Sequence, residues 1–105
     1  MIVTFDKEYL KELYETGKAS EKKYRFQPDI IARYQKRIDQ LLDAFNIQTL
    51  CTISSLHYEE LKGDKKGISS IRVNDKYRIE FTVTDEDAEP VVTVCNILDP
   101  SNHYK

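Results

Sequence analysis

Residues 56–81 read LHYEELKGDKKGISSIRVNDKYRIEF, and this stretch decides the fold that the sequence predicts. Two of its segments alternate apolar with polar residues, one ending at Val73 and one beginning at Tyr77. Alternation with a period of two is typical of half-buried β-strands, and polar residues between two such segments are typical of a turn. The stretch therefore predicts a β-hairpin whose apolar side chains share one face.

The same alternation predicts that the turn contains three residues, 74–76. A two-residue turn would place Ile71 opposite Arg78 and mix the two faces, whereas a three-residue turn places Ile71 opposite Ile79. Because a shift of one residue moves every side chain to the other face, the three-residue turn is favoured. In that register Arg72 lies directly opposite Arg78.

The opposed Arg72 and Arg78 allow two interpretations. Like charges that face each other across a hairpin are destabilising, so an anion held between the two guanidinium groups would stabilise the pair. Alternatively, both side chains extend into water, or one of them pairs with Glu80. The first interpretation predicts an anion site on the polar face of the hairpin, and the second predicts none.

The composition predicts one soluble domain, residues 1–105. The chain is 40% hydrophobic and 32% charged, with a formal net charge of −2, and a chain of this length supports one modest core. The charge is segregated, because the segment 61–78 holds six basic residues and two acidic ones. A basic face of this kind attracts a polyanion. The six basic residues are Lys62, Lys65, Lys66, Arg72, Lys76 and Arg78.

Several functional classes are not favoured by the sequence. Cys51 and Cys95 lack the spacing of a zinc site, and we expect both as small buried side chains. The glycine-rich phosphate-binding motifs and the nucleophile elbow are absent. Two cysteines without a signal peptide, and no segment of membrane-spanning length, fit a reducing cytosol. The sequence thus predicts a cytoplasmic protein without a metal or another cofactor.

A short strand and a first helix are predicted at the start of the chain. Residues 2–5 are apolar and mostly β-branched, as in a strand. Asp6 can cap the helix that follows, and Gly17 is a natural end for it.

The strongest helical pattern runs over residues 28–44, with Pro28 in the first turn. The opposite face carries Arg33, Lys36 and Arg37, and this face is either solvated or binds a partner or a nucleic acid. The apolar residues at steps of three and four are Ile30, Ile31, Tyr34, Ile38, Leu41, Leu42 and Phe45.

The remaining segments complete an α+β fold. Residues 46–55 fit either a helical turn or an extended piece, and residues 85–90 read as an acidic turn. Residues 91–98 favour a central strand that is buried on both faces. A strand, two helices and a three-strand meander predict a mainly antiparallel sheet with the helices packed on one face. Arg72 and Arg78 would then lie on the other face.

The two histidines are candidates for acid–base chemistry. His57 and His103 lie at opposite ends of the hairpin-and-strand unit. Beside lysine and arginine, one imidazole could take the proton of an RNA 2′-hydroxyl and another could protonate the departing 5′-oxygen. Tyr58, Tyr77 or Tyr104 could stack on a base. On the residues alone, a surface or packing role for either histidine is more common.

The sequence resembles the HigB branch of the RelE/ParE toxin superfamily over nearly its whole length. The resemblance rests on His57, on the loop LKGDKKG (61–67), on the hairpin SIRVNDKYRI (70–79) and on His103 near the end. It implies a ribonuclease that enters the ribosomal A site and cleaves messenger RNA without a metal. It also implies a helix-turn-helix antitoxin encoded alongside, and contact with operator DNA only through the antitoxin complex.

The resemblance implies roles for four residues. His57 matches a general base or acid, Lys62 a phosphate-supporting lysine, Arg78 a transition-state clamp, and His103 the C-terminal histidine. Relatives often place the lysine only three residues after the histidine and often end in Asp-Tyr-His, so this chain departs from the pattern at both places. The further residues expected to bind RNA or phosphate are Lys65, Lys66, Arg72, Lys76, Tyr77 and Tyr104.

Two other functions remain open on the same fold. One is a ParE-like poison of DNA gyrase without nuclease activity, and the other is an inactive interaction module. The presence together of His57, Lys62, Arg78 and His103 favours the nuclease.

Overall fold

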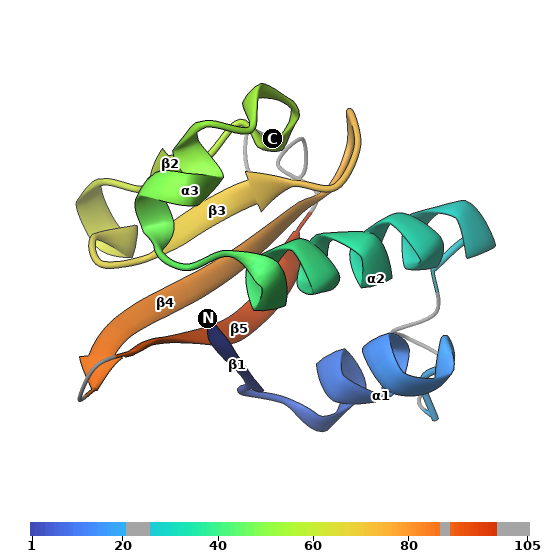
Figure 1. Ribbon diagram of the computed structural model, residues 1–105. Helices are drawn as coiled ribbons and strands as arrows, with labels where there is room; N and C mark the ends of the chain where they lie inside the picture. The colour runs from blue at the N-terminus through green and yellow to red at the C-terminus, as the bar shows by residue number, and fades with distance from the viewer. Residues whose placement is uncertain (21–25, 87–88, 99–105) are drawn as a thin grey trace.

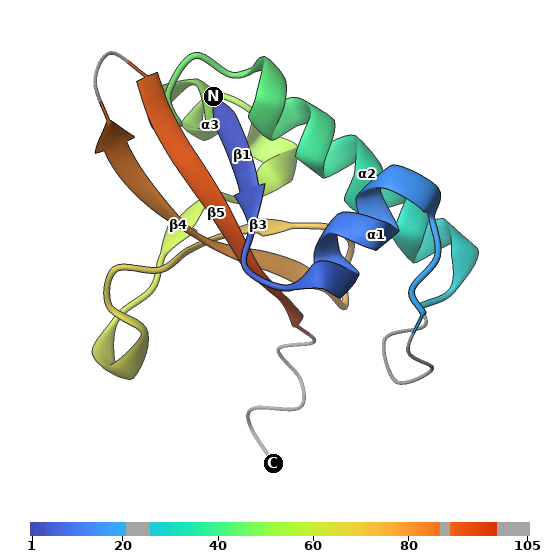
Figure 2. The same ribbon diagram turned by 90° about the horizontal axis from the view of Figure 1, so that it is seen from below.

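The described part of the chain folds into a five-stranded mixed sheet with helices on one face (Figure 1). The computed structural model describes residues 1–20, 26–86 and 89–98. The strand order is β1-β5-β4-β3-β2, in which β1 runs parallel to β5 and the other pairs are antiparallel. Figure 2 shows the helical layer and the sheet as two separate layers. The α+β prediction is confirmed, and the sheet has one face that the helices do not cover.

The first strand and helix begin the chain as predicted. β1 (Ile2–Phe5) leads into α1 (Glu8–Thr16). Gly17 ends the helix in the left-handed region, with φ of 75°, and its N–H donates to the carbonyl of Leu13. The expected cap by Asp6 is wrong, because Lys7 occupies the N-cap position and no side chain caps the helix.

The long helix α2 (Pro28–Asp43) packs its apolar face on the sheet and on α1. The hydroxyl of Tyr34, fully buried, donates to the carbonyl of Leu10 at 2.7 Å. The predicted apolar face does not extend to Phe45, whose side chain is 86% exposed. The backbone becomes extended at Ala44, so the helical periodicity stops one residue before Phe45.

Short elements connect α2 to the hairpin. The ambiguous segment after α2 contains one helical turn, which Asn46 caps by accepting a hydrogen bond from the backbone N–H of Thr49 at 3.0 Å. Cys51 on this turn is exposed and Cys95 is half-buried, so the expected burial of both cysteines is wrong. The connecting elements are α3 (Ile47–Cys51), η2 (Ser54–Leu56), β2 (Glu59–Glu60) and η3 (Gly63–Lys65).

The hairpin has the predicted register. β3 (Ser69–Arg72) and β4 (Arg78–Glu86) pair Ile71 with Ile79 and Arg72 with Arg78. The three-residue turn is therefore confirmed.

The last described strand, β5 (Glu89–Leu98), lies inside the sheet between the edge strand β1 and the middle strand β4. Its pairing with β4 extends to Glu86 opposite Glu89, so strand pairing replaces most of the predicted acidic turn. Burial on both faces is wrong, because Val92 and Val94 are buried while Thr93 on the other face is half-buried. No helix in the described ranges is long and apolar enough to cross a membrane.

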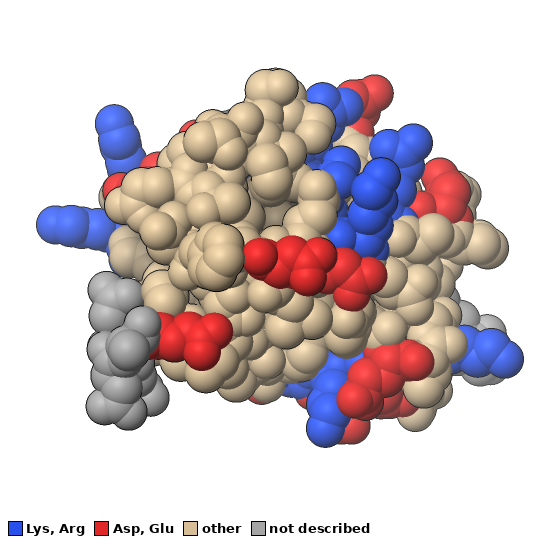
Figure 3. Space-filling view, viewed as in Figure 1, with Lys and Arg blue, Asp and Glu red and all other residues tan. Residues whose placement is uncertain are grey.

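The helix side of the molecule has segregated charge. Arg33 and Lys36 are exposed on α2, as are Asp39 and Asp43 further along the same helix. Figure 3 shows Lys and Arg atoms gathered over α2 toward the hairpin turn, with a strip of Asp and Glu atoms beside them. Opposite charges therefore lie on neighbouring parts of one surface.

Candidate functional site

The candidate site lies on the sheet face that the described helices leave uncovered (Figure 2). Side chains alternate between the two faces of a strand, so Ser70 and Arg72 of β3 share this face with Arg78 and Glu80 of β4. In the register of the hairpin, Ser70 lies opposite Glu80 and Arg72 lies opposite Arg78. Ser70 and Glu80 are buried, whereas Arg72 and Arg78 are half-buried. We call this side of the hairpin the open face.

Arg78 is held by groups from two elements. Its Nε donates to Ser70 Oγ at 3.0 Å, and its Nη2 donates to the carbonyl oxygen of His57 at 2.6 Å. Glu59 Oε2 lies 3.9 Å from the same Nη2. The side chain is 21% exposed, and this burial lowers the pKa of Arg78, which Glu59 raises and Arg72 lowers. None of the contacts between described residues uses Nη1, so this end of the guanidinium can bind an anion.

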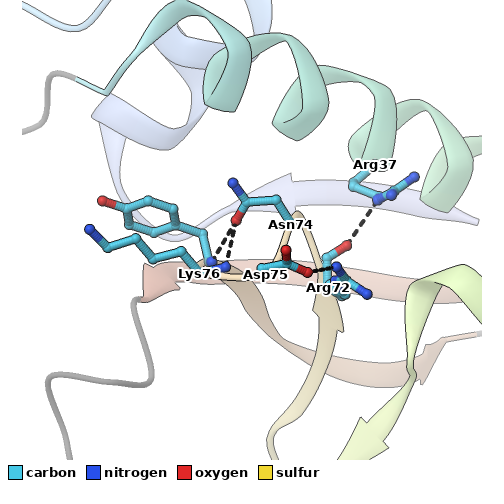
Figure 4. A network of polar contacts seen from close by, with 6 residues as sticks. Arg37, Arg72, Asn74, Asp75 and Lys76 are labelled. Atoms are coloured by element: carbon cyan, nitrogen blue, oxygen red, sulfur yellow. Dashed lines mark hydrogen bonds and ion pairs between the residues drawn. The ribbon is translucent and has the colours of Figure 1, made fainter.

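Arg72 has a different partner. Its guanidinium pairs with the carboxylate of Asp75, and its backbone carbonyl accepts a hydrogen bond from Arg37 Nε at 2.9 Å (Figure 4). Each arginine of the opposed pair thus has its own carboxylate, Asp75 for Arg72 and Glu59 for Arg78. The pairing with Glu80 that was one interpretation of the sequence is wrong for both arginines.

Glu80 instead forms an ion pair with Lys65 of η3. Lys65 Nζ lies 2.8 Å from Glu80 Oε2, and the side chains are 39% and 7% exposed, respectively. A nearly buried carboxylate requires a partner of this kind. The pair brings one lysine of the basic loop to the open face.

His57 contacts Arg78 through its backbone carbonyl oxygen. It ends η2 with a positive φ of 45°, which is uncommon for a residue other than glycine. Strained backbone of this kind is concentrated at functional sites. The imidazole is exposed, and the carbonyl contact with Arg78 brings these two predicted site residues together. His103 and Tyr104 lie outside the described residues.

Lys62 and Lys66 lie elsewhere. They line a cleft of about 690 Å³ together with Ile47 of α3, Ser69 and Val83. Because Ser69 and Ser70 are consecutive in β3, their side chains point to opposite faces of the sheet. The cleft is therefore on the helix side, and the structure does not bring Lys62 to Arg78.

The hairpin turn and its aromatic residue also face the helices. Asn74 Oδ1 accepts hydrogen bonds from the backbone N–H groups of Lys76 and Tyr77, at 2.9 and 2.8 Å. The ring of Tyr77 packs edge-on against Phe26 with centroids 5.5 Å apart, and Lys76 Nζ lies 5.9 Å from the Tyr77 centroid. Tyr77 therefore contributes to packing on the side away from Arg78.

Three residues contact the charged groups of the site but were not predicted as site residues from the sequence: Ser70, Glu59 and Glu80. The alternation of the hairpin could have found Ser70 and Glu80, because it places them on the same face as the two arginines. In the ranges that the structure describes, no three His, Cys, Asp or Glu residues gather as metal ligands would.

Comparison with known proteins agrees with this fold. Residues 3–100 match the family described as "RelE-like toxin of type II toxin-antitoxin system HigB". Toxin HigB-1 of Vibrio cholerae serotype O1 is 31% identical over 104 residues, which cover 98% of this chain and 100% of that protein.

Solved structures share the fold at low sequence identity. A YoeB/ParE toxin from Agrobacterium tumefaciens is similar with a TM-score of 0.56 and 17% identity, over 94% of this chain and 98% of that one. YafQ from E. coli gives a TM-score of 0.58 and 13% identity, over 98% of this chain and 97% of that one. From the family match and the 31% identity, the chain belongs to the HigB-like, RelE-type toxins of type II toxin–antitoxin systems.

Proposed function

We propose that this toxin is a ribosome-dependent endoribonuclease that cleaves messenger RNA in the A site. Membership of a toxin family whose members are generally ribonucleases supports this proposal. The observation that carries it is the geometry of Arg78, which Ser70 and the His57 carbonyl fix on the open face with Nη1 unused by any described residue. A fixed cation beside an exposed histidine suits phosphodiester chemistry.

The proposed reaction needs no metal. One imidazole, of His57 or His103, takes the proton of the 2′-hydroxyl, and the 2′-oxygen attacks the adjacent phosphorus. The bond from phosphorus to the 5′-oxygen breaks, and the second imidazole protonates that oxygen. Arg78 stabilises the negative charge that grows on the phosphate, with a loop lysine as a second cation. The products are a 2′,3′-cyclic phosphate and a 5′-hydroxyl.

The test is cleavage of a defined messenger RNA on translating ribosomes by the purified toxin. We expect cuts within codons in the A site, no cleavage of the same RNA without ribosomes, and protection by the cognate antitoxin. The proposal is overturned if the folded toxin leaves the messenger intact. Inhibition of gyrase supercoiling in the same preparation would then identify a ParE-like activity.

A further inference from the structure

The basic loop between β2 and β3 sends its lysines to both sides of the sheet. Lys62 lines the cleft on the helix side, beside Ser69. Lys65, three residues later, reaches the opposite side and meets Glu80 at 2.8 Å. Lys65 belongs to the 3₁₀ turn η3, whereas Lys62 precedes it in extended backbone with φ of −124° and ψ of 174°, so the two side chains leave the chain from different backbone conformations.

Glu80 fixes Lys65 on the open face. The carboxylate is 7% exposed, and a carboxylate with so little access to water is stable only with an opposite charge beside it. Lys65 is its ion-pair partner among the residues that the structure describes. Lys65 remains 39% exposed, so its three N–H donors are not all directed at Glu80 and another anion can approach.

Glu80 and Arg78 are close neighbours on one face of β4. They are two residues apart along the strand, which separates their Cα atoms by roughly 7 Å. Ser70, directly opposite Glu80, accepts the hydrogen bond from Arg78 Nε. The ammonium of Lys65 and the guanidinium of Arg78 therefore flank the same small area of surface.

We propose that Lys65, positioned by Glu80, is the second cation at the phosphate that Arg78 binds, in the role that the family resemblance gives to Lys62. This inference rests on the proposed nuclease function. When a phosphate enters, Lys65 exchanges part of its contact with Glu80 for the phosphate oxygens and stays beside Arg78. Lys62 then contributes to RNA binding by its charge alone.

The first experiment compares two lysines of the same loop. Lys65→Met should lower kcat for messenger cleavage on ribosomes on the order of 100-fold, as expected for loss of one donor to the transition state. The matched variant Lys62→Met should act mainly on KM, because it removes a charge that contacts RNA equally in ground and transition states. The opposite pattern, with kcat depending on Lys62, overturns the inference.

The second experiment tests Glu80 as a positioning residue. Glu80→Gln should lower kcat about tenfold when Lys65 is present, because a displaced group loses much of its effect. It should cause no further loss in the Lys65→Met background, since it acts only through that lysine. Glu80→Asp, which keeps the charge, should recover part of the rate. If Glu80→Gln lowers kcat equally with and without Lys65, Glu80 has a structural role, and the inference that it positions Lys65 is overturned.

Thermal melting of each variant shows whether it folds, and if Glu80→Gln does not fold, the comparison of the two lysines decides. Failure of the inference is distinguishable from failure of the proposed function. If the parent toxin cleaves but Lys65→Met cleaves at the parent rate, only the inference is wrong. If the parent does not cleave, both are wrong.

Discussion

Arg78 shows how a single residue can be held for function at little cost to stability. Its contacts are with Ser70, with the His57 carbonyl and, at 3.9 Å, with Glu59. None of these partners belongs to the apolar core between sheet and helices. A change at Arg78 should therefore separate activity from folding.

Arg78→Ala should reduce messenger cleavage on the order of 100-fold or more, because it removes a preorganised donor to the transition state. Arg78→Lys should not restore the rate, since an ammonium cannot reproduce the planar guanidinium held at three points. The free energy of unfolding should fall by about 1 kcal/mol through the lost hydrogen bonds. Cleavage assays paired with urea unfolding measure both effects. Parent-level cleavage by a folded Arg78→Ala variant would rule out the phosphate clamp.

Tyr34 gives a prediction for stability at high pH. Burial raises the pKa of its hydroxyl above the ordinary 10.0, and nearby Tyr9 raises it further. Below pH 10 the group is neutral in both folded and unfolded chains, so it adds no pH dependence. Above pH 10 the unfolded chain loses this proton while the folded chain keeps it, so stability should fall as the pH rises.

Tyr34→Phe isolates this effect. At pH 8 the variant should be less stable by about 1 kcal/mol, because the hydrogen bond to Leu10 is lost. Between pH 10 and 11.5 its stability should decline less steeply than that of the parent. Urea unfolding at several pH values measures the difference, and parallel curves would contradict the assignment.

At the scale of elements, one arginine joins α2 to the hairpin. Arg37 Nε donates to the carbonyl of Arg72, and its Nη1 donates to Gln40 at 2.8 Å. Burial lowers the pKa of Arg37, and Arg33 and Arg72 lower it further. The predicted basic face of α2 is therefore divided, because Arg37 has a structural partner whereas Arg33 and Lys36 are exposed.

Arg37→Ala should lower the free energy of unfolding by about 1.5 kcal/mol, since a hydrogen bond from a charged donor to a half-buried carbonyl is lost. Arg33→Ala, an exposed position on the same helix, should change it by less than about 0.5 kcal/mol. Chemical denaturation of both variants gives the comparison. Equal effects would mean that the contact with Arg72 contributes nothing to stability.

The elements that could be predicted from the sequence are those with a long regular pattern. The limits of α2 and the register of the hairpin follow from periods of 3.6 and 2 over many residues. Tyr77 was assigned to RNA, although the same alternation places it with Ile79 on the helix side. A role for Tyr77 in RNA binding stays a prediction, and the structure shows its ring in contact with Phe26.

The loop between β2 and β3 could not be assigned in this way. Lys62 and Lys65 are on opposite sides of the sheet, but a short irregular segment has no period from which to infer direction. The backbone role of His57 was equally hidden, because a positive φ at a histidine has no sequence signal. The contact that fixes Arg78 therefore needed the structure.

At the scale of the whole molecule, segregated charge on α2 favours an oriented encounter with the antitoxin. Arg33 and Lys36 are exposed on the same helix as the exposed Asp39 and Asp43. Figure 3 shows basic and acidic atoms gathered on neighbouring parts of this surface. We predict that an acidic part of the cognate antitoxin approaches this basic segment. Association should slow as salt increases, because screening weakens long-range attraction.

The double variant Arg33→Glu, Lys36→Glu should lower the association rate about tenfold at low salt, with a smaller effect at high salt. Stopped-flow mixing with the purified antitoxin measures this rate. Exchanging Lys7 and Lys11 for glutamate changes the net charge equally at exposed positions near α1 and serves as the control. If both double variants slow association equally, net charge rather than this surface is responsible.

The parallel pairing of β1 with β5 has a consequence for the synthesis of the toxin. Ile2 pairs with Val91 and Phe5 with Val94, so β1 has no strand partner until β5 has been synthesised. β4 likewise has β3 alone as a partner until β5 appears. Contacts between distant parts of a chain form late, and a nascent chain without them stays unfolded. A chain halted before residue 91 therefore lacks β5 and its pairings with β1 and β4, so the sheet that carries Arg78 cannot form until β5 has been synthesised.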